Sequence, residues 1–348
     1  MMNEELKKQL RNRGICVVIP TYNNDTTIKT VVEKSLLYCD DVIVVTDGCT
    51  DRTTDILDAI DGITIVSYPQ NRGKGYALKM GFRKALEMGF SYAITLDGDG
   101  QHYPEDIPLF LKANQEYPQS LIIGSRQLEG VDRSKGSSFA NKFSNFWFYV
   151  QTGRALPDTQ TGYRLYPLHR LCGLSLLTSR YEAELELLVF ASWHGVKLIP
   201  IPVQVYYPPR NERVSHFRPG KDFARISVLN TVLCLLAVVY GLPLRLWRTL
   251  MTFLRTAYSL LFFLFFTLVV FTPFVWIYTK VGKMTERRRY RLHQLIYHAS
   301  RFVMIHHGIP GTKYEYKVAE GIDFNKPRII ICNHQSHLDL MCQLVFTP

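Results

Sequence analysis

Two carboxylates one residue apart, followed by an amide, are the strongest chemical signal in the sequence. In "ITLDGDGQHYPED", residues 94–106, an apolar run ends at Asp97, Asp99 and Gln101. Carboxylate and amide oxygens are the ligands that Mg²⁺ and Mn²⁺ prefer, and these ions often share their coordination shell with substrate phosphates. The alternative interpretation is a polar turn that ends a buried strand before a helix near Pro104. Residues elsewhere in the chain must decide between the two.

Two further polar stretches suit a nucleoside diphosphate. Asp47 in "VIVVTDGCTDRT" ends another apolar run, where its carboxylate could accept a hydrogen bond from a base N–H. It could equally be a turn residue before a helix that Thr50 or Asp51 caps. In "NRGKGYAL", Lys74 offers a point charge for phosphate between two glycines, although the P-loop pattern is absent. Each feature is weak evidence on its own.

Arginines recur in three later stretches. "IGSR" ends at Arg126, and "PDTQTGYR" contains Asp158 and Arg164. The third stretch, "NERVSHFRPGKDF", contains Arg213, Ser215, His216 and Arg218. Several arginines around a diphosphate would stabilise the charge that grows on a leaving group. Surface arginines are common, so a solvated side chain is the alternative for each one singly.

These polar stretches follow strands that are expected to form one sheet. Five β-rich apolar runs, "CVVIP", "DVIVVTD", "ITIVSY", "YAITLD" and "SLIIGS", alternate with segments of helical apolar spacing. Near-continuous apolar strands separated by helices predict an α/β fold with a mainly parallel sheet covered on both faces. Such sheets bind ligands beyond the carboxyl ends of their strands, where Asp47 and Asp97 lie.

The order of these stretches resembles that of family 2 glycosyltransferases with the GT-A fold, which is Rossmann-like. "VVIPTYNN", "VTDGCTDRT", "NRGKGYAL", "LDGDGQHYPED", "IGSR" and "DTQTGYR" succeed one another within roughly the first 225 residues. The similarity is closest to polyprenyl-phosphate sugar transferases of the dolichol-phosphate mannose synthase type. "SHFRPGKDF" is similar to the end of that group's domain. The resemblance implies a glycosyltransferase domain over residues 1–225.

The resemblance also implies how a nucleotide-sugar donor is bound. Pro20, Tyr22 and Asn24 correspond to the first nucleotide-contacting loop, with Asn24 in place of a common glutamate. Asp47 corresponds to the aspartate that reads the base. Lys74 is the candidate contact for the donor phosphates.

The metal site is implied in the same way. Asp97 and Asp99 correspond to the DxD motif, with Gln101 as the third ligand of Mg²⁺ or Mn²⁺, whereas His102 has no such role in the family. Arg126 corresponds to a residue near the diphosphate. The remaining donor-binding candidates are Arg213, Ser215 and Arg218.

The implied reaction is a single displacement that inverts the sugar carbon. A lipid phosphate acceptor is already an anion, whereas a hydroxyl acceptor requires a general base. Asp158, in the DxxxG[FY] motif, is the first candidate, and Arg126 is the catalytic cation. Glu182 and Glu184 are the next candidates for the base, with an exposed helix face as the alternative.

Two other classes of function compete with a metal-dependent transferase that uses a UDP-sugar. A nucleotidyltransferase can share the sheet and the acidic site, but it would need a glycine-rich signature that "IPTYNNDT" lacks. A non-enzymatic sugar-nucleotide binding module is the other, and the intact DxD pattern argues against it. The acceptor could be polyprenyl phosphate, or a glycolipid or acylated metabolite if the chain is half of a glycosyltransferase–acyltransferase fusion.

Composition and charge favour a membrane partner over nucleic acid. The chain of 348 residues has a net charge of +11, and its lysines and arginines become dense after about residue 210, beside apolar runs. No zinc-finger or RNA-binding signature accompanies them. Seven scattered cysteines without a CxxC pair suit a reducing compartment, and the charged N-terminus lacks the apolar core of a signal peptide. We therefore expect the catalytic region at the cytoplasmic face of the inner membrane.

Residues 226–284 are predicted to be a membrane-associated helical region. Two apolar runs of about 17 and 21 residues flank a segment whose Arg245, Arg248 and Arg255 share one helical face. That pattern is typical of a helix on an anionic leaflet, and a solvated bundle helix is the alternative. Basic residues on both sides of the longer run predict that both ends are cytoplasmic. Pro273 could bend this run into a re-entrant hairpin.

Residues 285–348 carry a second resemblance. "NHQSHLD" places His334 and Asp339 in the HxxxxD spacing of glycerolphosphate-type lipid acyltransferases, in which the Asp orients the His as general base. The alternative is a chance pair on a loop. Because nine residues follow Asp339, we expect a truncated acyltransferase-like part without acyltransferase activity.

Overall fold

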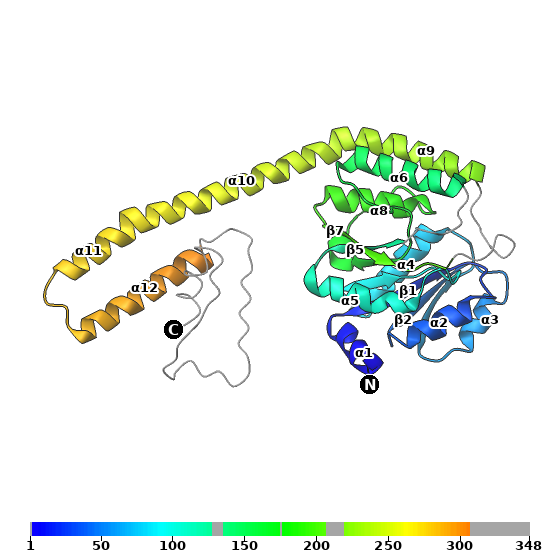
Figure 1. Cartoon of the computed structure of the whole chain (residues 1–348), viewed down its shortest axis with the longest axis horizontal. Helices are drawn as coiled ribbons and strands as arrows, with labels where there is room; N and C mark the ends of the chain where they lie inside the picture. The colour runs from blue at the N-terminus through cyan, green and yellow to red at the C-terminus, as the bar shows by residue number, and fades with distance from the viewer. Residues whose placement is uncertain (1, 127–134, 175, 207–218, 307–348) are drawn as a thin grey trace. The chain divides into compact units, whose positions relative to one another are not determined.

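The computed structural model describes residues 2–126, 135–174, 176–206 and 219–306 (Figure 1). The chain forms two compact units, Met1–Arg245 and Leu246–Pro348. The candidate residues Arg213, Ser215, Arg218, His334 and Asp339 lie outside the described residues.

The first unit is built around a seven-stranded sheet in the order β3-β2-β1-β4-β6-β5-β7. Its strands are β1 Ile15–Thr21, β2 Val42–Asp47, β3 Ile63–Tyr68, β4 Tyr92–Thr95, β5 Leu121–Arg126, β6 Arg164–Pro167 and β7 Leu198–Val203. β6 is antiparallel to β4 and β5, and the other pairs are parallel. The predicted α/β fold with a mainly parallel sheet is confirmed, and all five predicted strands are present.

Two strands were not predicted, for different physical reasons. β6 has four residues that include Arg164 and Pro167, so it does not read as an apolar run, unlike the equally short β4. β7 contains Pro200 and Pro202, which lack a backbone N–H and are tolerated because β7 is an edge strand.

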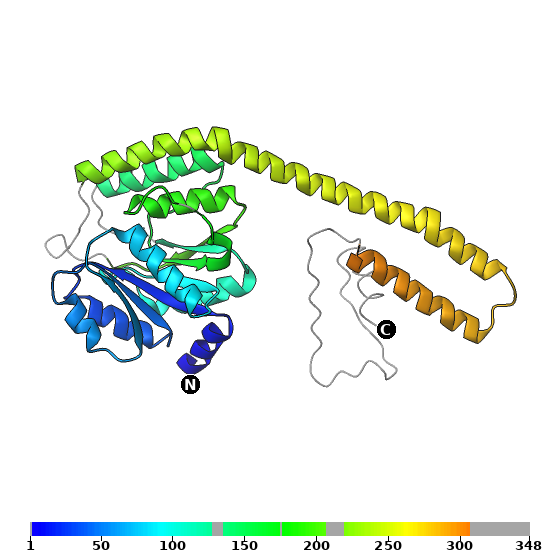
Figure 2. The ribbon, with the colours of Figure 1, turned by 180° about the vertical axis from the view of Figure 1, so that it is seen from behind.

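Helices cover both faces of the sheet, which explains why its central strands are apolar throughout (Figure 2). One face packs against α1 Met2–Asn12, α2 Ile28–Leu36, α3 Thr53–Asp58 and α5 Ile107–Glu116, and the other against α4 Lys74–Glu87, α6 Lys135–Thr152, α8 Glu182–Trp193 and α9 Pro219–Leu236. Every residue of β1 and β2 is buried. Along β1, Val17 and Ile19 face the first group of helices, and Cys16 and Val18 face the second. Two apolar layers therefore hold the strand ends in place. The short elements η1 Pro104–Asp106 and α7 Leu168–Leu171 complete the unit.

One continuous helix, Ala224–Lys280, is long and apolar enough to cross a membrane. Its 57 residues have a mean hydropathy of 2.5 in their most apolar window, none of which is buried. It comprises part of α9, the π-helical η2 Ala237–Gly241, α10 Leu242–Phe265, the π-helical η3 Phe266–Phe271 and α11 Thr272–Lys280. This is the sole candidate span among the described residues.

The suggested bend at Pro273 is wrong, because the helix continues through it. Pro273 stands in the first turn of α11, directly after the π-helical turns of η3. Wider turns accommodate a proline, whose ring would otherwise clash with the preceding turn. The chain reverses only after Lys280, before α12 Glu286–His306. There the Arg288 guanidinium donates to the Tyr278 carbonyl at 2.6 Å and lies over its ring.

Candidate active site

Three adjacent strands bring the polar stretches to one edge of the sheet. β2, β1 and β4 are consecutive and parallel, so their carboxyl ends lie side by side. These ends lead into the loop after Thr21, into Asp47 and into the turn that carries Asp97 and Asp99. A cavity of about 480 Å³ lies beside that turn and is lined in part by Asn24, Asp99 and Gln101.

Lys74 is held between two carboxylates. Its Nζ lies 2.7 Å from Asp97 Oδ1 and 2.9 Å from Glu184 Oε2. Burial alone would lower the pKa of Lys74, but attraction to Asp97 and Glu184 outweighs it and raises the pKa. The same ammonium helps to hold the pKa of Asp97 below its ordinary value, although burial opposes this. In the structure, Lys74 is therefore a cation paired with the first carboxylate of the DxD motif.

Glycines at two positions allow this close approach. A Cβ at Gly162 would lie 2.6 Å from Lys74 Nζ and 2.7 Å from Asp97 Oδ2. A Cβ at Gly75 would overlap the Cβ of Ala183 on α8, so glycine lets α4 and α8 pack closely. Steric crowding thus explains why glycine stands in "GKG" and in DxxxG[FY], and the sequence pattern alone does not reveal this crowding.

Asp97, Asp99 and Gln101 have the chemistry of a divalent metal site. Asp99 Oδ1 accepts a hydrogen bond from the Gln101 backbone N–H at 3.0 Å, which closes the turn. Burial, followed by repulsion from Asp97, raises the pKa of Asp99 to about 6. Two carboxylates this close, one of them already on a cation, suit Mg²⁺ or Mn²⁺. The described residues contain no cluster of three or more His, Cys, Asp and Glu side chains for a metal, so phosphate or water oxygens would complete the shell.

His102 stabilises the turn by a hydrogen bond to its backbone. Its side chain is buried, and its Nδ1 lies 3.4 Å from the Asp97 backbone nitrogen, which donates to it. Burial lowers the pKa of His102 to about 4, so the ring is neutral and can accept this bond. The imidazole also packs on Tyr163, with ring centroids 5.1 Å apart. That His102 is not a metal ligand stays a prediction.

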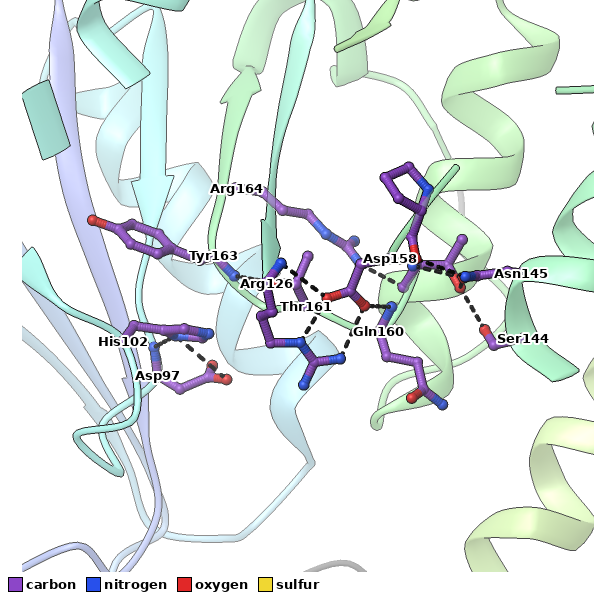
Figure 3. A network of polar contacts seen from close by, with 12 residues as sticks. Asp97, His102, Arg126, Ser144, Asn145, Asp158, Gln160, Thr161, Tyr163 and Arg164 are labelled. Carbon is purple, nitrogen blue, oxygen red and sulfur yellow. Dashed lines mark hydrogen bonds and ion pairs between the residues drawn. The ribbon is translucent and has the colours of Figure 1, made fainter. Parts of the chain in front are cut away.

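Arg126 and Asp158 form a bidentate ion pair (Figure 3). Arg126 Nε donates to Asp158 Oδ2 at 2.6 Å, and Nη2 donates to Oδ1 at 2.9 Å. Asp158 is only 1% exposed, and Oδ1 also accepts from the Gln160 backbone N–H. The pair comes from the end of β5 and from the loop before β6. Because both oxygens of Asp158 are engaged, its geometry suits the positioning of Arg126 better than proton abstraction.

Arg164 is part of the protein interior. It is fully buried, and its guanidinium donates to the Thr159 and Glu184 carbonyls, each at 2.9 Å. A diphosphate contact for Arg164 is therefore wrong. The exposed-face alternative for the two glutamates is also wrong, since Glu182 and Glu184 are 8% and 7% exposed.

The nucleotide-binding candidates lie at the ends of β1 and β2 and in the loop after β1. Both Asp47 oxygens accept backbone N–H groups, from Arg72 at 2.7 Å and Gly73 at 2.8 Å, and so fix the start of α4. Asn24 Nδ2 donates to Thr21 Oγ1 at 3.0 Å. Pro20 is buried at the end of β1, and Tyr22 follows it half-buried. Gly48, directly after Asp47, has a φ of 65°, which lets the chain turn sharply there.

Sequence comparisons agree with this architecture. Residues 16–166 match the profile of glycosyl transferase family 2. An uncharacterised protein of Methanocaldococcus jannaschii is 30% identical over 218 residues, which cover 59% of this chain and 88% of the relative. The UDP-N-acetylglucosamine–dolichyl-phosphate N-acetylglucosaminyltransferase of Methanococcus voltae is 28% identical, over 57% of this chain and 88% of the relative. The undecaprenyl-phosphate mannosyltransferase of Micrococcus luteus is 27% identical, over 54% and 82%.

A solved structure shares the fold. Glucosyl-3-phosphoglycerate synthase from Mycobacterium tuberculosis, in complex with Mn²⁺, UDP and phosphoglyceric acid, has a TM-score of 0.52 at 20% identity. The match covers 68% of this chain and 82% of that chain. The fold is thus GT-A-like. The family profile and the named sugar transferases among the relatives indicate that the enzyme class is hexosyl transfer. With its family profile, its relatives and its sheet in agreement, the chain belongs to glycosyl transferase family 2.

Proposed function

We propose that this chain is an inverting, metal-dependent glycosyltransferase that moves a sugar from a UDP-sugar to a lipid-linked acceptor such as polyprenyl phosphate. Two relatives support the acceptor class, because their names specify dolichyl phosphate and undecaprenyl phosphate. The name of the first of these also specifies a UDP-sugar donor. Membership of the family disfavours the nucleotidyltransferase alternative.

The proposal rests on one observation: a pair of carboxylates and an arginine–aspartate ion pair lie at the same edge of the sheet. The carboxylates Asp97 and Asp99 end the β4 turn, and the Arg126–Asp158 pair ends β5. Asp97, Asp99 and Gln101 would hold Mg²⁺ or Mn²⁺, which would offset the charge on the departing nucleoside diphosphate. Arg126 adds a positive charge that Asp158 orients in advance, so little reorganisation is needed during the reaction.

The engagement of Asp158 by Arg126 favours an acceptor that is already an anion. A phosphate oxygen can attack the sugar carbon without losing a proton, so no general base is required. A hydroxyl acceptor would need a carboxylate with a free oxygen. Glu184 Oε1, which is buried and has no hydrogen-bond partner among the described residues, is then the next candidate after Asp158.

A membrane location supports the lipid acceptor. The helix Ala224–Lys280 has the length and composition of a membrane span. Within the first unit, α6 and α9 pack against each other and expose large apolar side chains. These are Phe139, Phe146, Tyr149, Val150, Val228, Val232 and Leu235. We assign residues 226–284 to membrane association, and the sugar-transfer site to the cytoplasmic face.

A donor screen tests the proposal. The full chain in detergent is given several nucleotide sugars with Mn²⁺, with and without polyprenyl phosphate, and release of the nucleoside diphosphate is measured. We expect release from a UDP-sugar that requires both the metal and the lipid phosphate. Asp99→Ala should lower it by at least about 100-fold, whereas Asp58→Ala, at the exposed end of α3, should not. Equal turnover by both variants would rule out the metal assignment.

A further inference from the structure

The position of Lys74 suggests a role that a simple phosphate contact does not explain. Its Nζ already lies 2.7 Å from Oδ1 of Asp97, the first carboxylate of the metal site. A divalent ion bound to the same carboxylate would repel this ammonium at close range. The cation must therefore move, or share the carboxylate at a loss of affinity, whenever the metal binds.

Glu184 gives the ammonium a second anchor. Its Oε2 lies 2.9 Å from Lys74 Nζ, and its side chain is buried on the first turn of α8. The Glu184 carbonyl accepts from Arg164 Nη1 at 2.9 Å, so the backbone at this point is fixed. The lysine has a long, flexible stem from the start of α4, whereas its partner is held rigidly. Lys74 can thus leave Asp97 without losing every counter-charge.

Resting on the proposed function, we propose that Lys74 is a placeholder cation that couples metal binding to donor binding, with Glu184 as its positioning residue. In the donor-free chain Lys74 neutralises Asp97 and competes with the metal. When metal and donor arrive together, the ammonium stays on Glu184 and turns its other N–H groups to the diphosphate. The chain thereby discriminates against a metal that arrives alone.

The proposal predicts opposite effects for two substitutions. Lys74→Met removes both the competing cation and its diphosphate contact, so Mn²⁺ alone should bind more tightly and UDP should assist it less, through direct coordination of the metal only. Glu184→Gln leaves Asp97 as the only carboxylate on Lys74, so Mn²⁺ alone should bind more weakly. Coupling between two ligands is reciprocal, so Mn²⁺ should assist UDP by the same factor in the unmodified chain.

Matched controls separate this effect from a change in net charge. Lys34→Met removes a positive charge near Asp99, where Lys34 lines the same cavity and pairs with Glu105 at 3.6 Å. Glu182→Gln removes a negative charge from the same turn of α8, and neither of the ion pairs of Lys74 involves it. Both controls should shift Mn²⁺ affinity less than their counterparts do.

The test is a Mn²⁺ titration of the full chain in detergent, with and without saturating UDP. Free Mn²⁺ is followed by its electron paramagnetic resonance signal, and UDP by calorimetry. We expect UDP to tighten Mn²⁺ binding by about 10-fold in the unmodified chain. Lys74→Met should tighten binding of Mn²⁺ alone by a similar factor and reduce the UDP effect to well below about 10-fold. Glu184→Gln should weaken binding of Mn²⁺ alone.

Each other outcome overturns a defined statement. Unchanged or weaker Mn²⁺ binding in a folded Lys74→Met chain, or a full UDP effect there, overturns the placeholder role while the proposed transferase stands. If that variant does not fold, tighter or unchanged Mn²⁺ binding by Glu184→Gln overturns the role. Failure of the unmodified chain to bind Mn²⁺ with or without UDP overturns the metal dependence in the proposed function as well.

Discussion

Gly162→Ala is expected to disturb the active site by a steric clash alone. The added methyl would lie 2.6 Å from Lys74 Nζ, closer than the 3.0 Å that real Cβ atoms keep, so the ammonium must retreat by about 0.4 Å. Lys74 Nζ and Asp97 Oδ1 lie 2.7 Å apart, so the ammonium can avoid the methyl only by leaving its place between the two carboxylates. Because the clash is with the end of a flexible side chain, we expect a loss of stability of about 1 kcal/mol, the low end of the range for overpacking. Misplacement at the reacting centre should lower turnover by roughly 10- to 100-fold.

Thermal unfolding by circular dichroism and UDP release measure the two effects separately. For a domain of this size, we expect the Tm to fall by about 2–4 °C for each kcal/mol lost. Gly220→Ala in α9 is the matched control, because a Cβ there meets no atom within 4 Å. It should leave Tm unchanged or raise it slightly, since alanine favours a helix. Turnover by Gly162→Ala within twofold of the unmodified chain would refute the claim that this glycine makes room for the ion pair.

Two more predictions concern charge. Arg126→Lys cannot form both bonds to Asp158, so it should lower kcat in a UDP-release assay by roughly 10-fold or more, and an equal kcat would contradict the orienting role. Because burial and then Asp97 raise the pKa of Asp99 from 3.8 to about 6, the folded chain keeps a proton there that the unfolded chain releases. The contribution of Asp99 to the stability of the metal-free chain is complete below about pH 4 and is lost as the pH rises through 6. Denaturant titrations of the unmodified chain and Asp99→Asn across this range measure the difference, which should vanish if the pKa of Asp99 is ordinary.

Much of the fold could be predicted because its signals are local. Apolar runs such as "CVVIP" and "DVIVVTD" identify buried strands, and the intervening helices require parallel neighbours. β6 and β7 were not predicted because β6 contains an arginine and a proline among its four residues, and β7 contains two prolines. The continuation of the long helix through Pro273 was missed for a related reason, since the π-helical turns before it have no sequence pattern.

By itself, the sequence determined which residue types stand at the strand ends, and that the chain carries an apolar run long enough to cross a membrane. The alternation of strands with helices predicts parallel strands, whose carboxyl ends, with Asp47 and Asp97, lie at one edge of the sheet. Only the tertiary structure decided what those residues touch. Lys74, Asp97 and Glu184 come from α4, the β4 turn and α8, and Asp158 reaches Arg126 across the sheet edge. Such contacts join residues distant in sequence, so their distances depend on how helices pack on the sheet, which no local pattern encodes.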